Sequence, residues 1–366
     1  MQPPNSFRLV LLITLSAAVL GALFARSEYH FGGADYAATY LHGALVGACN
    51  GAILSSIEIY ALSRTPGESF RRLSFLPYLA LRFFIYVAVI LLVEVAVNRA
   101  LPNASGEVAS ITRADMVFSV AVSLGYNLLF GVNDLLGPGV LFAFVAGRYH
   151  QPRLEERALL FIDMRASTAI AERLGDARFL DFLNRFLVDV SLAVAEAGGE
   201  IHKYVGDQVI ATWRLKPGLN RAGCVSACFA ALERLVANGP AYDRDFGARA
   251  DFRAALHCGP VAVGELGYLK KEIALIGDAM NTTARIEQVC RDVGCRVLAS
   301  AALLERLATL PAGVTRRSLG PLPMRGKERA LEVYALEVAE SPYPAPSPAS
   351  ANDARLGRQI DPASTM

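Results

Sequence analysis

The apolar residues of this chain are distributed unevenly, and this constrains its fold more than any other feature. The mean hydropathy is +0.34 over 366 residues, which is unusual for a soluble protein. The apolar excess lies before residue 147, and the length suffices for two or three folding units. We therefore expect an apolar half, residues 1–147, followed by a soluble half.

Four apolar runs in the first half have the length of a membrane span, about 17–25 residues. They are Leu9–Ala25, Tyr40–Leu62, Phe75–Val97 and Met116–Leu136. The first run follows Arg8, as in a signal peptide, but the three later runs favour a multispan anchor. We expect residues 1–147 to form a transmembrane bundle of about four helices in the lipid bilayer.

The arginines indicate how this bundle is oriented. Arg64, Arg71 and Arg72 lie between the second and third runs, and Arg148, Arg153 and Arg157 follow the fourth. Positive residues concentrate on the cytoplasmic side, so we expect a multi-pass inner (plasma) membrane protein with its soluble half in the cytoplasm. A fifth apolar stretch, Leu135–Ala146, is short and contains Gly137-Pro138-Gly139. We interpret it as interfacial or re-entrant; a true fifth span would reverse the topology.

Several polar residues lie at membrane depth, where they need partners. They are Glu58, Arg82 and Glu94, with Asn50 and His42. One interpretation is a sensing site for an unknown membrane or small-molecule stimulus. The other is a structural ion pair, or side chains that reach the membrane surface from the span ends. The sequence leaves both open.

The soluble half has the pattern of an α+β domain. Residues 148–157 are interpreted as a juxtamembrane linker. Strands are predicted over 158–163, 200–213 (a hairpin), 249–258, 261–266, 295–299, 314–319 and 331–338, and helices over 167–197 (broken at Gly175-Asp176), 220–237, 279–293 and 301–308. This order is the ferredoxin-like βαββαβ arrangement. Residues 339–366 are rich in proline, serine and alanine and are predicted to be a disordered tail.

Charge, cysteine and histidine usage narrow the function classes. The formal net charge of +2 is too small to indicate nucleic acid as a partner. None of the six cysteines has the spacing of a zinc site, so buried thiols are favoured over a disulfide or a metal site. His150, His202 and His257 have no serine or cysteine partner at a telling spacing and are interpreted as structural.

Two aspartates at strand ends carry the clearest chemical signal. Asp163 ends the run 158–163, and Asp207 lies in a Gly206-Asp207 turn between the strands of the hairpin. Two carboxylates on neighbouring strands can hold two divalent ions over a triphosphate, as an in-line phosphoryl or nucleotidyl transfer requires. Either aspartate alone could simply cap a turn.

Four segments of the soluble half occur in an informative order. They are Phe161-x-Asp163-Met164-Arg165-x-Ser167-Thr168, Lys203-x-x-Gly206-Asp207, Gly277-Asp278-Ala279-Met280-Asn281-Thr282-Thr283-Ala284-Arg285, and Arg325-Gly326-Lys327 with Tyr334. With them, residues 158–338 resemble the catalytic domain of the class III adenylate/guanylate cyclases. The multispan first half resembles, more loosely, that of bacterial membrane-anchored members. The resemblance implies that the ribose 3′-hydroxyl of a nucleoside triphosphate attacks its own α-phosphorus and that pyrophosphate leaves.

The resemblance also implies roles for individual residues. Asp163 and Asp207 would hold two Mg²⁺ or Mn²⁺ ions, and the backbone carbonyl of Met164 would complete a coordination shell. The turn that contains Ser167 and Thr168 opens a helix, so its N–H groups would cradle the β- and γ-phosphates.

The catalytic residues would be Asn281 and Arg285, which lie four apart on one helix face. Asn281 would orient the ribose, and Arg285 would stabilise charge on the α-phosphate. Arg325 would contact the terminal phosphates, with Lys327 as its substitute if the register is shifted by two. A solvated helix face and an exposed basic turn are the structural alternatives.

The resemblance places Lys203 where the family reads the purine edge. Lysine can donate to adenine N1, whereas guanylate-selective members typically carry glutamate there, so ATP is the expected substrate. The second purine-reading position is Ala274, where adenine-using members usually have aspartate or threonine. Alanine makes no side-chain hydrogen bond, so discrimination is expected to loosen unless the backbone or a neighbour such as Glu272 compensates.

In this family the metal aspartates and the Asn/Arg pair of one site belong to opposite subunits. The expected function is therefore a membrane-anchored adenylate cyclase that makes 3′,5′-cyclic AMP and pyrophosphate at a homodimer interface. One alternative is a guanylate or relaxed-specificity purine nucleotide cyclase, which only Ala274 suggests. Another is a catalytically silent membrane receptor, which should lack an aspartate, Asn281 or Arg285.

Overall fold

The structure is a computed structural model, and it divides into two compact units, Gln2–Phe142 and Ala143–Met366. It describes residues 6–28, 36–58, 75–100, 113–136, 147–215, 222–269, 271–322 and 330–338. Several predicted features lie outside the described residues: the loop 59–74, most of the fifth apolar stretch, Arg325, Lys327 and the tail 339–366.

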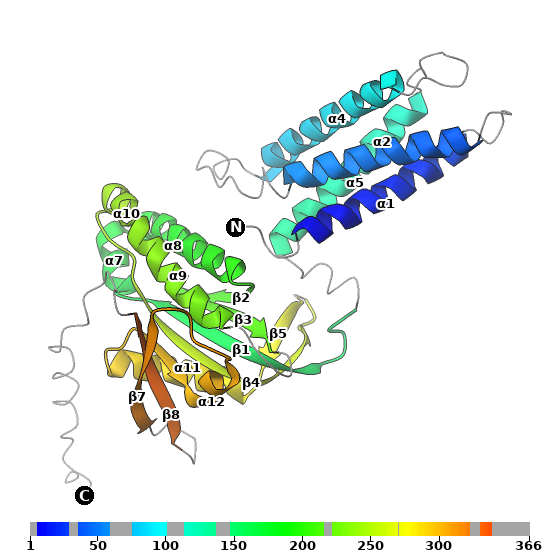
Figure 1. The fold of residues 1–366 in the computed structure, drawn as a ribbon. Helices are drawn as coiled ribbons and strands as arrows, with labels where there is room; N and C mark the ends of the chain where they lie inside the picture. Colours follow the sequence, from blue (N-terminus) through cyan, green and yellow to red (C-terminus); the bar gives the residue numbers. More distant parts are fainter. Residues whose placement is uncertain are drawn as a thin grey trace, which may run out of the picture. The chain divides into compact units, whose positions relative to one another are not determined.

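Four helices form the described part of the first unit (Figure 1). They are α1 (Ser6–Glu28), α2 (Tyr36–Ser56), α4 (Phe75–Ala100) and α5 (Arg113–Leu136). Each overlaps one of the four predicted apolar runs. Within the described residues, one helical segment, Leu76–Ala100, is long and apolar enough to cross a membrane. The spanning character of the other three helices stays a prediction.

Small residues bring α1 and α2 close together. A Cβ atom on Gly43 would overlap the backbone of Gly21, and one on Gly47 would overlap the carbonyl of Ala17. Helices whose facing residues are small can approach backbone to backbone, which is how helices gain packing contacts in a membrane.

The polar residues predicted at membrane depth include a buried ion pair. The guanidinium of Arg82 donates to Glu58, and the Tyr86 hydroxyl donates to the second carboxylate oxygen of Glu58 at 2.6 Å. Glu94 is buried as well. Glu58 and Arg82 therefore form the structural ion pair that was one of the two interpretations of these residues. A role of the polar residues in sensing stays a hypothesis.

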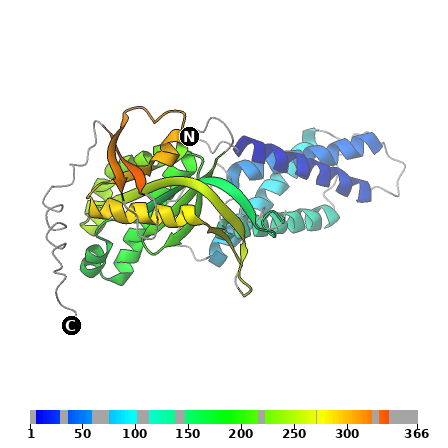
Figure 2. The ribbon, with the colours of Figure 1, turned by 90° about the horizontal axis from the view of Figure 1, so that it is seen from below.

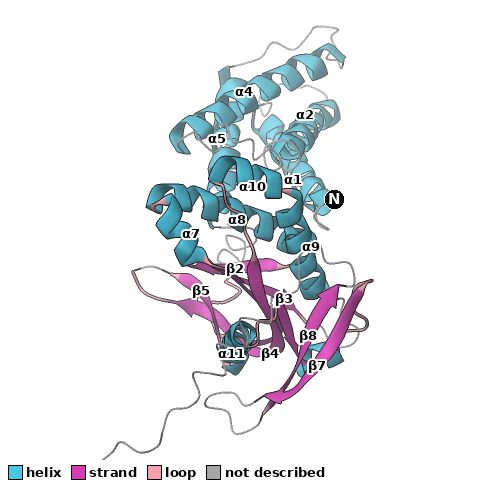
Figure 3. Ribbon diagram, turned by 90° about the vertical axis from the view of Figure 1, so that its left-hand side faces the viewer, coloured by secondary structure: helices cyan, strands magenta, loops and turns pink. Residues whose placement is uncertain are grey.

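The second unit is built on one mixed sheet (Figure 3). Its elements are β1 (Arg153–Met164), α7 (Ser167–Leu174), α8 (Asp176–Glu196), β2 (Glu200–Val205), β3 (Gln208–Arg214), α9 (Gly223–Ala237), α10 (Gly239–Phe246), β4 (Phe252–Leu266), β5 (Glu272–Ile276), α11 (Asp278–Asp292), β6 (Val297–Ser300), α12 (Ala301–Arg306), β7 (Val314–Leu322) and β8 (Leu331–Val338). The strand order is β2-β3-β1-β4-β6-β8-β7, and β5 pairs with β4 outside this path. Strands β2, β3, β1 and β4 are successively antiparallel. This confirms the predicted α+β, ferredoxin-like arrangement of the domain.

Some predicted boundaries were wrong. Strand β1 begins at Arg153, so the second half of the predicted linker 148–157 is strand. The predicted strands 249–258 and 261–266 are one long, curved strand, β4 (Figure 2), because Pro260 keeps its place in the ladder opposite Glu156. Helix α10 and strand β5 were not predicted, since both are short and α10 begins with a glycine and a proline.

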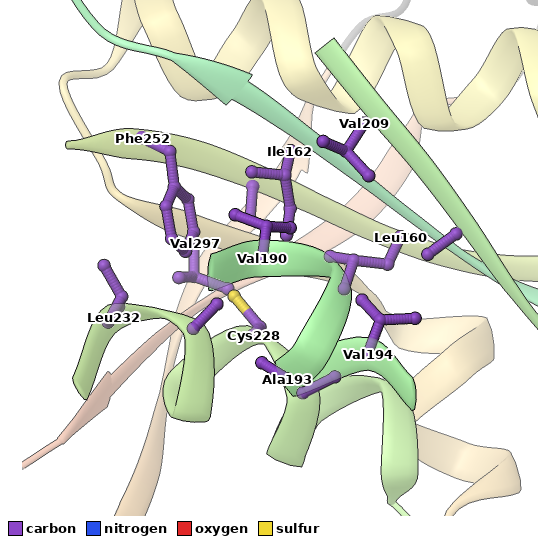
Figure 4. Packing of buried hydrophobic residues seen from close by; sticks show 14 of the residues in the cluster. Leu160, Ile162, Val190, Ala193, Val194, Val209, Cys228, Leu232, Phe252 and Val297 are labelled. Atoms are coloured by element: carbon purple, nitrogen blue, oxygen red, sulfur yellow. The ribbon is translucent and has the colours of Figure 1, made fainter. Parts of the chain in front are cut away.

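Strand β1 is buried on both faces, which explains why its apolar run does not alternate. Leu160 and Ile162 pack under α8 and α9 on one face (Figure 4). Leu159 and Phe161 point to the other face, against α11. Because side chains alternate along a strand, Asp163 lies on the α11 face.

Candidate active site

The two predicted metal-binding aspartates lie at the ends of neighbouring strands. In the β1–β3 ladder Asp163 is opposite Gln208, and Asp207 is the residue before Gln208. Gly206 has a positive φ of 62°, as the first position of a two-residue hairpin turn requires. The turn therefore holds the Asp207 backbone close to the end of β1.

Two arginines hold the carboxylate of Asp163. Its Oδ2 accepts hydrogen bonds from Arg253 at 3.2 Å and from Arg291 at 3.3 Å. Arg291 also pairs with Glu287 at 3.3 Å. Burial raises the pKa of Glu287, and the negative charge of Asp163 raises it further. Three elements thus meet at this point: β1, β4 and the C-terminal end of α11.

A strained turn follows Met164, which is itself buried. Ala166 has φ 56° and ψ 28°, a left-handed conformation that non-glycine residues rarely adopt. The Arg165 amide donates to the Asp251 carbonyl at 2.8 Å, and its side chain pairs with the Asp251 carboxylate at 3.3 Å. Helix α7 then begins at Ser167 without a side-chain cap. Its first N–H groups, at Ser167 and Thr168, therefore have no capping side chain and suit an anion.

Helix α11 separates the predicted catalytic residues from the metal aspartates of the same chain. Arg291, near the end of α11, contacts Asp163. Asn281 lies about 15 Å further along the helix axis, and Arg285 projects about 120° away from Arg291 around it. Asn281 is exposed and Arg285 is half-buried. The structure therefore brings Asp163 and Asp207 together but keeps Asn281 away from them.

The predicted purine-reading residues lie on β2 and β5. The ammonium of Lys203 pairs with Glu272 at 3.2 Å. Glu272 and Ala274 are alternate residues of β5 and share one face of the strand. The register of β2 shifts between Ile201 and Lys203, so His202 is the extra residue of a bulge.

Sequence reasoning missed the arginine contacts to Asp163. Arg253 is an isolated basic residue in an apolar strand, and no sequence spacing links it to Asp163. The i,i+4 spacing of Glu287 and Arg291 was the one available signal. Within the described ranges, no group of three His, Cys, Asp or Glu side chains could hold a metal ion. Arg325 and Lys327 lie outside those ranges.

His202, in the β2 bulge, is expected to make the free energy of unfolding depend on pH. Burial, with the charge of Lys203, lowers its pKa from 6.5 to about 4. The unfolded chain therefore binds a proton between these pH values that the folded chain does not, and stability falls as the pH drops below 6.5. The slope from this group is at most about 1.4 kcal/mol per pH unit.

The measurement is urea unfolding of the full chain in detergent at pH 7, 6 and 5, followed by the fluorescence of Trp213, the single tryptophan. His202→Gln is expected to flatten the pH dependence. An equal pH dependence in both proteins would contradict the assignment.

Known proteins resemble both the sequence and the fold. The family described as Adenylate and Guanylate cyclase catalytic domain matches residues 149–338. Adenylate cyclase 2 of Rhizobium meliloti (strain 1021) is 37% identical over 221 residues, which cover 60% of this chain and 61% of the relative. An adenylate cyclase of Anabaena cylindrica is 27% identical over 184 residues, 49% of this chain and 36% of the relative. These matches span less than two thirds of each relative's own length.

A solved structure shares the fold. The structure of a bacterial light-regulated adenylyl cyclase is 20% identical, with a TM-score of 0.51 over 68% of this chain and 71% of that chain. At this identity the likeness shows the fold alone. The family match, however, covers more than half of the residues and includes Asp163, Asp207, Asn281 and Arg285. The chain therefore belongs to the class III adenylate/guanylate cyclase family.

Proposed function

We propose that this chain is a membrane-anchored adenylate cyclase that converts ATP to 3′,5′-cyclic AMP and pyrophosphate. The observation that carries the proposal is the pairing of β1 with β3, which sets Asp163 beside the turn that holds Asp207. The uncapped start of α7 follows directly after Asp163. The names of the curated relatives, which are adenylate cyclases, support ATP as the substrate.

The residues present fit a pair of divalent ions. Mg²⁺ is usually held by one or two carboxylates together with water and substrate phosphates. Asp163 and Asp207 supply the carboxylates, and the Met164 carbonyl supplies a further oxygen. Bound Mg²⁺ or Mn²⁺ would lower the pKa of the attacking 3′-hydroxyl and neutralise the triphosphate.

The remaining residues bind and orient the nucleotide. The α7 start at Ser167 and Thr168 receives the β- and γ-phosphates, and Arg325 or Lys327 contacts the terminal phosphates. Asn281 orients the ribose so that its 3′-oxygen lies in line with the leaving pyrophosphate. Arg285 stabilises the negative charge that develops on the α-phosphate. Lys203 donates to adenine N1.

The position of α11 supports a site shared by two chains. Asn281 must touch the ribose of the same nucleotide whose phosphates lie at Asp163. Within one chain Asn281 lies about 15 Å along α11 from Arg291, the residue that contacts Asp163. A two-fold dimer solves this, because each chain then offers its metal half to the nucleotide-orienting half of its partner, and two equivalent sites result.

The first unit would anchor and control this dimer. Leu76–Ala100 has the length and composition of a span, and the arginine distribution favours a multi-pass inner membrane protein with a cytoplasmic catalytic domain. A stimulus that moved the helices could rotate one catalytic domain against the other.

A guanylate or relaxed-specificity cyclase is the second candidate. Ala274 favours it, because alanine offers no hydrogen bond to the purine. A silent receptor has less support, since Asp163, Asp207, Asn281 and Arg285 are all present.

Loss of either aspartate tests the proposed function. Asp163→Asn and Asp207→Asn are each expected to lower cyclic AMP formation by purified full-length protein, with ATP and Mn²⁺ or Mg²⁺, by on the order of 10³-fold, because each removes a charged ligand worth several kcal/mol. Asp181→Asn, on the exposed surface of α8, is the matched control. Retained activity in either site variant would contradict the assignment of the two aspartates as metal ligands. If the unaltered chain formed no cyclic AMP, the proposed function would be wrong.

Arg291 is expected to compete with metal for Asp163. Its side chain is 56% exposed, and exposed pairs contribute at most about 1 kcal/mol. Arg291→Gln should therefore tighten Mn²⁺ binding about two- to fivefold. The readout is titration of Mn²⁺ by electron paramagnetic resonance without nucleotide. Weaker or unchanged binding would show that Arg291 does not restrain the carboxylate.

A further inference from the structure

Lys203 and Glu272 form an ion pair that stability alone does not explain. Their charged atoms are 3.2 Å apart, and the two side chains are 39% and 40% exposed. Pairs with this exposure contribute little to folding. The pair joins β2 to β5, which lie 69 residues apart in the chain. Both charges are held together where a ligand can still reach them.

The local backbone aims Lys203 toward this partner. The β2–β3 ladder passes from Ile201 opposite Ala211 to Lys203 opposite Ile210, so one residue is left over. Such bulges re-aim side chains and are frequent beside active sites. A plain ladder would turn Lys203 to the other face of the strand.

The β5 strand offers one polar side chain, and it is Glu272. Ala274, on the same face, stands opposite Gly264 in the β4–β5 ladder. Neither of these residues can hydrogen-bond a base through a side chain. Glu272 is two positions before Ala274, and its carboxylate already lies at Lys203.

We propose that Glu272 is a specificity-determining residue whose carboxylate accepts a hydrogen bond from the 6-amino group of adenine. This inference rests on the proposed function. It thereby replaces the side chain that Ala274 lacks. Adenine places this donor beside its N1 acceptor, so the Lys203 and Glu272 pair matches both groups. Guanine carries an oxygen at position 6 and an N–H at N1. In the same pose the carboxylate would face the oxygen and the ammonium would face the N–H, and both contacts are repulsive.

The test compares ATP with purine riboside 5′-triphosphate, which has hydrogen in place of the 6-amino group. For the unaltered full chain, kcat/KM is expected to favour ATP about tenfold or more, because a hydrogen bond to a charged group contributes about 1.5–3 kcal/mol. Glu272→Ala should bring the two substrates within about twofold of each other. In Glu272→Gln the amide can also donate, so the GTP to ATP ratio of kcat/KM should rise about tenfold.

A matched control lies in the same hairpin. Glu265 is on β4 and pairs with Lys271 at 3.3 Å, so Glu265→Gln removes a comparable charge without touching Lys203. It should keep the preference for ATP over the analogue.

Two outcomes would overturn the inference. One is an unaltered chain that does not distinguish ATP from the analogue. The other is a Glu272→Ala chain that loses activity on both substrates equally, since Glu272 would then only position Lys203. Equilibrium binding of the two nucleotides to the full chain gives the same comparison. It therefore tests Glu272 even if no cyclic product forms and the proposed function fails.

Discussion

The packing of α11 against the sheet fixes the geometry on which the proposed site depends. Ile286 of α11 is buried in one cluster with Leu159 and Phe161 of β1, and Arg291, in the last turn of α11, contacts Asp163 at the end of β1. Because a helix is rigid along its axis, this packing also fixes the positions of Asn281 and Arg285. Asn281 lies in the first turn of α11, about 15 Å along the helix axis from Arg291, and Arg285 lies at the middle of the helix. The proposed catalytic centre, which needs Asn281 together with Asp163, would therefore take these residues from two molecules.

The sheet makes this division possible. Strand β1 is buried on both faces up to Met164, and its neighbours β3 and β4 hold it in register. Asp163 is therefore carried by a strand that is paired on both sides, while the turn at Ala166 stores backbone strain directly after it. Strain of this kind persists where the surrounding structure enforces it, and it is concentrated at binding sites. A carboxylate at the end of a paired strand, next to an uncapped helix start, suits a triphosphate and its counterions.

Local patterns were sufficient to predict most of the catalytic domain. The apolar run before Asp163, the Gly206-Asp207 turn and the helical spacing of Asn281 and Arg285 are short-range signals, and signals of this kind along the chain predicted the βαββαβ order of elements. The continuity of β4 through Pro260 could not be predicted, because a proline in a strand normally marks an edge or a break. The arginine contacts to Asp163 and the pairing of Lys203 with Glu272 join segments far apart in the chain. Only the folded backbone brings these groups together. The bulge at His202, which aims Lys203, likewise leaves no mark in the residue pattern.

Co-expression of two inactive chains tests the shared site most directly. Asp163→Ala removes a proposed metal ligand from one half-site, and Arg285→Ala removes a proposed catalytic group from the other. Each homodimer should be inactive, whereas each mixed dimer keeps one intact site. With random pairing, cyclic AMP formation in membranes should recover to about a quarter of that of the unaltered chain. Recovery near this level would support a site built from two chains. No activity beyond that of either variant alone would contradict it and would place the whole site within a single chain.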